Sequence, residues 1–148
     1  MVAPLASVAA FEPVERIRDK LRANVDLNQF DLPIFHAAVS DRDGRGLMLD
    51  TGEEHELSAT MDEAGAVLAG KPHKEVSVPV AKLDTLVSAG TIRPPDLIKI
   101  DVEGHEAAVL RGMMNQLEGK QPALLIEVLS LGAAYEVDRL TRPFGYVV

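Results

Sequence analysis

Apolar residues gather along the chain in short runs, and the spacing within each run predicts a strand or a helix. Several runs are almost continuously apolar, which is typical of strands in a parallel sheet that is covered on both faces. These runs lie at residues 7–11, 34–39, 97–102 and 123–129, and a last short strand is expected at residues 145–148. Residues 76–80 alternate strictly, which predicts a half-buried strand, and Pro79 places it at or near a sheet edge.

Apolar residues at helical spacing occupy the intervals between these strands. After Pro13, which suits the first turn of a helix, apolar residues recur every three or four positions. A longer helix is expected after Gly104, with Gly119 as its stop. The helices are predicted at residues 14–25, 83–87, 105–118 and 133–140. Strands that alternate with helices predict an α/β fold, with a mostly parallel sheet and helices on both of its faces.

Residues 41–75 differ in character from the rest of the chain, because they hold nine acidic and four basic residues. Within this stretch we expect a short strand at residues 46–49, a weak helix at residues 61–68 and otherwise a loop. We interpret it as a variable acidic surface insertion in a single domain of residues 1–148. The alternative is a lid over the substrate.

The composition narrows the class of protein and of partner. A formal charge of −8 and an aromatic content of 4% argue against a surface that binds nucleic acid. No apolar run reaches the roughly 20 residues that a membrane-spanning helix needs. The apolar N-terminus has no Lys or Arg before Arg16, unlike a signal peptide, and the absence of cysteine fits a reducing compartment. We therefore expect a cytoplasmic protein that neither enters a membrane nor binds nucleic acid.

The segment from Pro95 to Glu106 gives the strongest indication of an active site. Lys99, Asp101 and Glu103 occupy every second position, so they share one face of the predicted strand and approach its carboxyl end. In open α/β sheets the ligand crevice lies just beyond the carboxyl ends of parallel strands. This segment is therefore interpreted as the floor of an active site. The alternative is an exposed edge strand with a solvated polar face.

Acidic residues follow three of the predicted strands. Glu12, the pair of Asp101 and Glu103, and Glu127 each come at or near a carboxyl end. A carboxylate in this place can accept two hydrogen bonds from a ribose diol, and Glu12 is the best candidate for that role. The alternative is that Glu12 stabilises the start of the following helix through the helix dipole.

Several of these segments resemble the FkbM-type methyltransferases. The resemblance rests on residues 10–13, on residues 37–41 with Gly44, on residues 78–80 and 83–84, and above all on residues 96–104 with Glu106. It continues to residues 126–128 and covers most of the chain from Val8 to Leu129. The run at residues 96–104 is specific to the family, whereas the Phe-Glu-Pro motif is shared with many nucleotide-binding folds.

The resemblance implies the Rossmann-like class I methyltransferase fold and S-adenosylmethionine as the cofactor. By that likeness Glu12 would hold the cofactor ribose, and Ser40 and Asp41 would border the adenine. Asp101 would lie beside the methionine part and the transferred methyl group. Such enzymes mostly methylate hydroxyl groups, so the expected acceptor is a small molecule or a glycan, with lipids and peptides also open.

The acceptor hydroxyl benefits from a base, although methyl transfer depends mainly on orientation. Asp101 and Glu103 are the catalytic candidates, and His105 is a further candidate that we interpret as a surface histidine at the start of a helix. Lys99 is interpreted as a structural partner of Asp101 or Glu103. A less favoured alternative is a site for Mg²⁺ or Mn²⁺. Its ligands would be Asp101, Glu103 and Glu127, with His36 or His105.

The chain departs from the family pattern at its start. The glycine-rich turn that follows the first strand of this fold is not found, and that strand would precede Ser7. We therefore expect an N-terminally shortened domain that binds the cofactor weakly or not at all and has unpaired strand edges, which favour self-association. The alternative function is a non-catalytic remnant or interaction module that keeps the scaffold.

Overall fold

The computed structural model describes residues 7–50, 59–60 and 74–147, in which short strands alternate with helices. The strands are β1 (Ala10–Phe11), β2 (Ile34–Phe35), β3 (Ala38–Val39), β4 (Gly44–Asp50), β5 (Ala59–Thr60), β6 (Lys74–Ala81), β7 (Leu97–Ile100) and β8 (Ala123–Ile126). The helices are α1 (Glu15–Leu27), α2 (Leu83–Ser88), α3 (Glu106–Arg111), α4 (Met114–Glu118) and α5 (Leu131–Thr141), followed by the 3-10 helix η1 (Arg142–Phe144). The helix predicted at residues 61–68 lies outside the described residues. Among those described, no helix is long and apolar enough to cross a membrane.

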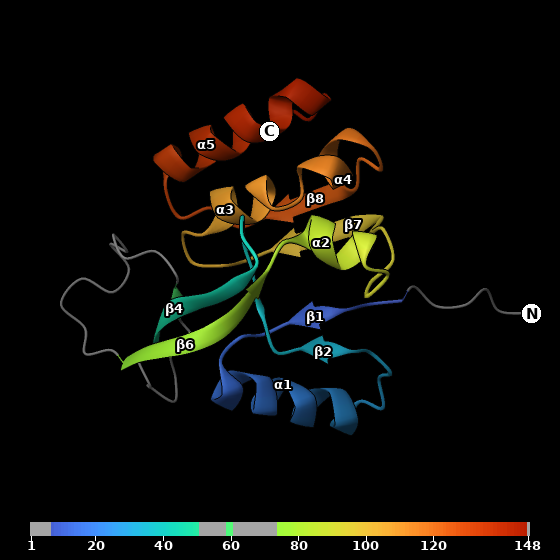
Figure 1. The fold of residues 1–148 in the computed structure, drawn as a ribbon, viewed down its shortest axis with the longest axis vertical. Coiled ribbons are helices and arrows are strands. Elements are labelled where there is room, and N and C mark those ends of the chain that lie inside the picture. The colour runs from blue at the N-terminus through green and yellow to red at the C-terminus, as the bar shows by residue number, and fades with distance from the viewer. Residues whose placement is uncertain (1–6, 51–58, 61–73, 148) are drawn as a thin grey trace, which may run out of the picture.

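The described strands form three separate sheets rather than one continuous sheet. β1–β2 and β7–β8 are parallel pairs. The third sheet has the order β3-β6-β4-β5, with β3 parallel to β6 and β4 antiparallel to both of its neighbours. In Figure 1, α1 lies along β1–β2 at one end of the molecule, and α3, α4 and α5 lie around β7–β8 at the other end. The predicted α/β character and the parallel pairing are confirmed.

Two groups of buried apolar side chains hold these elements together. The first joins α2, β7, α3, α4 and α5, and Leu110 and Leu117 are its fully buried leucines. The second joins the start of α1 to the third sheet through Val14, Met48 and Val78. Full burial of one such side chain contributes about 1.5–3 kcal/mol. Because Met48 belongs to β4, part of the stretch interpreted as a surface insertion contributes to the core.

One face of the β7–β8 pair is exposed, so the prediction that these strands are covered on both faces is wrong for the described residues. Leu97 is 65% exposed and Leu125 is 59% exposed, whereas Ile100 is 2% exposed. The buried Ile100 and the neighbouring Ile98 pack with residues of α3, α4 and α5, and no described helix covers the opposite face. The exposed face of β7 therefore carries both Leu97 and Lys99, so it is solvated but only partly polar.

Strand β6 lies between β3 and β4, next to the edge strand β3, so the prediction from Pro79 of a strand at or near an edge is confirmed. β3 pairs only with Val80 and Ala81 of β6, so the missing N–H of Pro79 falls beyond that ladder. The strand predicted at residues 34–39 is divided into β2 and β3, because each part pairs with a different partner. The strand predicted at residues 145–148 is not formed by its described residues.

The helix predicted at residues 105–118 is interrupted at Gly112 and resumes as α4. Gly112 approaches the end of β3 so closely that a Cβ on it would lie 1.9 Å from the carbonyl oxygen of Ser40. Asp84 caps the start of α4, because its carboxylate accepts the backbone N–H groups of Asn115 at 3.0 Å and Gln116 at 3.3 Å. This interruption lets α3 pack directly against the end of β3.

Candidate functional site

The chain turns sharply between β7 and α3, at the segment that the sequence predicts as the floor of an active site. Glu103 has a φ of 50°, a left-handed conformation that is uncommon for a residue with a side chain, and Gly104 follows with a φ of 99°. Glu106 is 2% exposed, and its Oε1 accepts the N–H of Gly104 at 2.9 Å. The buried Glu106 therefore closes the turn and holds Glu103 in its strained conformation.

Three further carboxylates gather at this turn. Glu127 donates its backbone N–H to the carbonyl at the end of β7 at 2.9 Å, which brings it next to Asp101. Asp101 accepts a hydrogen bond from Nζ of Lys99 at 2.7 Å, which confirms the structural pairing predicted for Lys99. Burial raises the pKa of Glu103, and the charges of Asp101, Glu127 and Glu106 raise it further. Glu103 therefore binds a proton more tightly than an ordinary glutamate.

Glu12 has a different environment, at the end of β1. Its Oε1 accepts the N–H of Val14, the residue that precedes α1, at 2.8 Å, so the carboxylate lies at the start of that helix. Burial raises the pKa of Glu12, although the hydrogen bond from Val14 and the charges of Arg16 and Arg18 act to lower it. Arg16 in turn binds Asp50 through Nε at 3.2 Å and through Nη2. The ribose role of Glu12 stays a prediction.

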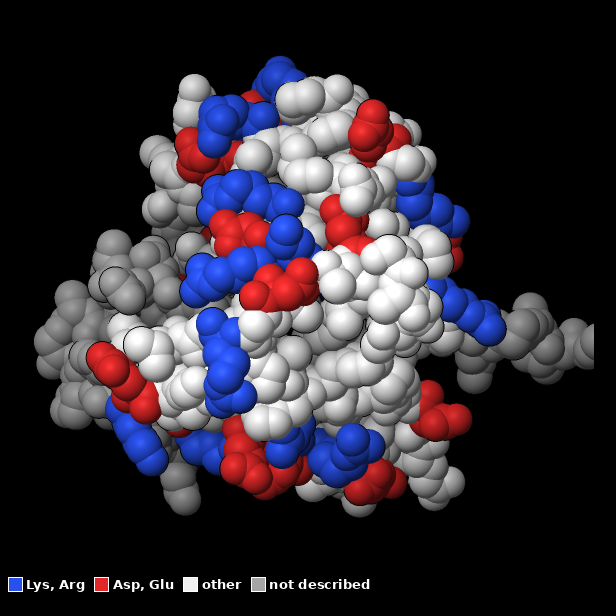
Figure 2. All heavy atoms as spheres, viewed as in Figure 1, with Lys and Arg blue, Asp and Glu red and all other residues white. Residues whose placement is uncertain are grey.

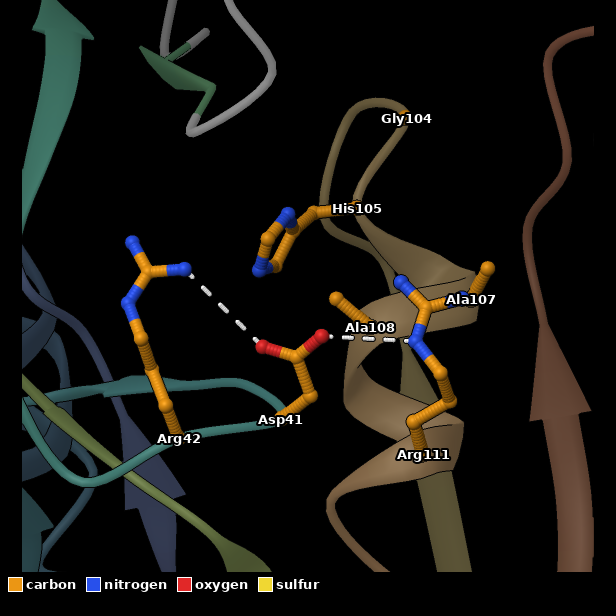
Figure 3. A pocket seen from close by; sticks show the side chains of 7 residues that line it. All are labelled: Asp41, Arg42, Gly104, His105, Ala107, Ala108 and Arg111. Atoms are coloured by element: carbon orange, nitrogen blue, oxygen red, sulfur yellow. Dashed lines mark hydrogen bonds and ion pairs between the residues drawn. The ribbon is translucent and has the colours of Figure 1, made fainter.

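A cavity of about 310 Å³ opens between the end of β3 and the start of α3 (Figure 3). Its lining residues are Asp41, Arg42, Gly104, His105, Ala107, Ala108 and Arg111. Its volume lies at the lower end of the range for small-molecule sites, which is about 300–1,000 Å³. Gly104 belongs to the turn after β7, so the cavity adjoins the acidic segment.

Ser40 and His105 join the two sides of this cavity. Ser40 is completely buried, and its Oγ lies 2.8 Å from Nε2 of His105. The carbonyl of His105 accepts the N–H groups of Ala108 and Val109, both at 3.1 Å, so His105 starts α3. The prediction for His105 is right about the helix, and its half-buried imidazole, which lines the cavity, also bonds to a buried hydroxyl.

Asp41 lies at the cavity between the guanidinium groups of Arg42 and Arg111 (Figure 3). Its Oδ2 accepts a hydrogen bond from Nε of Arg111 at 3.3 Å, and its Oδ1 lies 3.9 Å from Nη1 of Arg42. Partial burial acts to raise the pKa of Asp41. The hydrogen bonds from Arg111 and Ser40 and the two guanidinium charges outweigh burial, so the pKa is lowered. Asp41 is therefore an ionised acceptor at neutral pH.

Arg42 and Arg111 complete the cavity, and the sequence does not single them out. Arg111 binds an aspartate 70 positions away, a separation at which no local spacing rule applies. Basic and acidic side chains are interspersed over this face of the molecule (Figure 2). Because such mixed charges are common on this protein, an arginine or an aspartate in the sequence does not by itself indicate a site.

The alternative of a metal site gains no support from the part of the chain that the structure describes. No cluster of three or more His, Asp or Glu side chains suited to a metal ion is found among these residues. Nε2 of His36 lies 2.9 Å from the carbonyl of Pro13, and His105 bonds to Ser40. The two histidines are thus engaged elsewhere than with Asp101, Glu103 and Glu127.

Comparisons with known proteins agree with the resemblance seen in the sequence. The family described as Methyltransferase FkbM domain matches residues 1–147. The hexuronic acid methyltransferase AglP of Haloferax volcanii is 31% identical over 161 residues, which cover 97% of this chain and 61% of the relative. The chain therefore spans less than two thirds of the length of this curated relative. No solved structure matches the chain.

Proposed function

The chain belongs to the FkbM methyltransferase domain family. From this premise we propose that it is the methyltransferase domain of an enzyme that uses S-adenosylmethionine to methylate a hydroxyl group of a small molecule or glycan. The observation that carries the proposal is the acidic turn after β7, where Asp101, Glu103 and Glu127 gather next to the cavity. A Rossmann-like class I fold is part of the proposal. In that fold a further strand separates β1 from β7, which accounts for separate parallel pairs.

The residues of the site fit the proposed cofactor in charge. S-adenosylmethionine carries a sulfonium and an ammonium group, and carboxylates complement both. We assign Asp101 to the methionine part, and Asp41, which lines the cavity, and Ser40, which lies behind it, to the adenine side. Glu12 is assigned to the ribose, because a carboxylate that, among the described residues, accepts only the N–H of Val14 keeps further lone pairs for a diol. When bound, the cofactor supplies the electrophilic methyl group.

Glu103 is the residue that we assign as the base for the acceptor hydroxyl. Its raised pKa makes its carboxylate a stronger proton acceptor than an ordinary glutamate. Its strained backbone conformation is of the kind that occurs at active sites. Asp101, which the hydrogen bond from Lys99 orients, would complement the positive charges of the methionine part when the cofactor is bound.

The similarity to a hexuronic acid methyltransferase favours a sugar among the possible acceptors. A sugar offers several hydroxyl groups and suits the exposed, polar strand ends. A scaffold without catalysis is not favoured, because the strand-end carboxylates that the reaction needs are all present.

Binding of S-adenosylhomocysteine, followed by ¹H–¹⁵N NMR on the chain of 148 residues, tests the proposal. We expect saturable shifts at Glu12, Ser40, Asp41 and the turn after β7, with a Kd of about 1 mM, corresponding to about −4 kcal/mol. The Glu12→Gln variant should weaken binding, whereas Glu118→Gln, on an exposed position of α4, should not. A folded chain without shifts at these residues would contradict the proposal.

A further inference from the structure

A chain of hydrogen bonds links Asp41 to both ends of helix α3. At the start of α3, Nε2 of His105 lies 2.8 Å from Oγ of the buried Ser40. The Oγ of Ser40 donates to Oδ1 of Asp41 at 3.3 Å. At the end of α3, Nε of Arg111 donates to Oδ2 of Asp41 at 3.3 Å. Both oxygens of the Asp41 carboxylate are therefore oriented from the same helix.

The direction of these bonds follows from the donors that are present. A carboxylate only accepts, and a hydroxyl has a single proton to donate. If the proton of Ser40 goes to Asp41, the oxygen of Ser40 must accept from His105. His105 then carries a proton on Nε2, and the order of donation is from His105 to Ser40 to Asp41.

The lining of the cavity offers an acceptor and open space beside it, as an amino group on a ring requires. Apart from its charged groups and His105, the lining consists of Gly104, Ala107 and Ala108, whose small size leaves room beside α3. Asp41 is a hydrogen-bond acceptor at this cavity, and an amino group on a ring is a donor.

We propose that His105 is a positioning residue, which acts through Ser40 to fix the carboxylate of Asp41 as the acceptor for the amino group of a 6-aminopurine ring. This inference rests on the proposed function, because the ring would be the adenine of the cofactor. It goes further by assigning to His105 the selection of a 6-amino ring over a 6-oxo ring. A 6-oxo ring presents a carbonyl to the carboxylate, so two acceptors would face each other.

Comparative binding of adenosine and inosine, followed by NMR on the whole chain, tests this selection. The native chain should bind adenosine about tenfold more tightly than inosine, a difference of about 1.4 kcal/mol. The ratio should fall to about one in Asp41→Asn. It should fall part of the way in His105→Ala, because the carboxylate of Asp41 still accepts but is no longer oriented through Ser40. It should return in His105→Gln, because the side-chain amide can again donate to Ser40. A variant that merely loosened the fold would weaken both nucleosides alike and leave their ratio unchanged.

A second measurement tests the hydrogen-bond chain without any ligand. In ¹⁵N-histidine NMR spectra, neutral His105 should carry its proton on Nε2, and the ring signals should change in Ser40→Ala. A proton on Nδ1 would overturn the inference and leave the proposed function intact. An adenosine-to-inosine ratio that survives in full in His105→Ala would also overturn it. Absence of binding by both nucleosides, with the proton on Nε2, would instead count against the proposed function.

Discussion

The turn after β1 and the turn after β7 begin from the same sequence pattern and reach different structures. Each follows a short parallel strand with an acidic residue and then enters a helix. After β1, the carboxylate of Glu12 accepts the N–H of Val14, just before α1. After β7, the backbone becomes left-handed at Glu103, and the buried Glu106 makes the structural hydrogen bond instead.

The difference shows that the hydrogen bond that holds a turn can come either from the acid at the strand end or from a separate carboxylate. In the first turn a single residue, Glu12, must serve the helix and any ligand together. In the second turn Glu106 carries the structural hydrogen bond, so Asp101 and Glu103 remain at the surface of the site. The second turn is thus the better place for chemistry, and the first is the better place for a fixed binding contact.

Gly112→Ala should have the largest effect, because it displaces the helix that supports the second turn. The added Cβ would lie 1.9 Å from the carbonyl oxygen of Ser40, so α3 must move. We expect a loss of about 3 kcal/mol of unfolding free energy in urea. The control is Gly132→Ala in α5, where the nearest atom is Oγ of Ser130 at 3.8 Å. If both variants were equally stable, the close approach of α3 to β3 would be wrong.

Glu106→Ala should break the second turn and spare the first. The N–H of Gly104 loses its acceptor in a buried place, which costs about 2 kcal/mol. Glu106→Gln keeps an acceptor oxygen and should cost less. Chemical denaturation gives the size of the loss, and amide hydrogen exchange should increase at residues 103–106. Faster exchange at residues 12–15 instead would show that the two turns are coupled.

Glu12→Ala should destabilise the first turn by about 1 kcal/mol, the usual cost of removing a helix-start acceptor. Thermal unfolding monitored by circular dichroism measures this change. Glu15→Ala provides a matched control, since Glu15 lies in the first turn of α1 and is largely exposed. Equal effects of the two substitutions would mean that the hydrogen bond from Val14 adds nothing beyond the helix dipole.

Glu103→Gly should stabilise the protein by about 1 kcal/mol, because glycine adopts the left-handed conformation without strain. The same change should reduce methyl transfer, since it removes the proposed base. Urea unfolding and a transfer assay on a protein that contains this domain would give the two values. A loss of stability would show that the Glu103 side chain supports the turn.

Glu103→Gln should have the smallest effect, and one that depends on pH. The folded state raises the pKa of Glu103, so it binds the proton more tightly than the unfolded state does. Ionisation of Glu103 therefore lowers the stability of the native chain as the pH rises from about 4.3, the ordinary pKa of glutamate, through the folded value. We expect the glutamine variant to gain less than about 1 kcal/mol relative to the native chain at about pH 7, and to lose this gain at about pH 4. An advantage that did not change with pH would exclude the charge as its cause.

The sequence predicts where helices and strands begin and end better than it predicts which of their faces are covered by other elements. Helical spacing after Pro13 and the breaks at Gly104 and Gly119 depend on neighbours along the chain, and the structure has them. The exposure of Leu97 depends on which helices cover the sheet, which an apolar run does not reveal. Pro79, by contrast, correctly places β6 near a sheet edge, because the ladder with the edge strand β3 covers only Val80 and Ala81.

The same limit applies to the candidate site. The carboxylates after β7 were predictable from their place at a strand end, but the alternation that was to align them stops at Ile100, and Glu103 lies in the turn. The bond between Ser40 and His105 spans 65 positions, and that between Asp41 and Arg111 spans 70. Neither pair has a spacing that a single sequence could reveal, so the cavity itself could not be predicted.

The exposed face of β7–β8 has a consequence for handling the protein in solution. The isoelectric point is about 4.9, and near that pH the electrostatic repulsion between molecules vanishes. The exposure of Leu97 and Leu125 does not depend on charge, so near that pH no repulsion opposes the hydrophobic association of two molecules through these side chains. Purification at a pH well above the isoelectric point, in buffers of low ionic strength, should therefore keep concentrated samples clear.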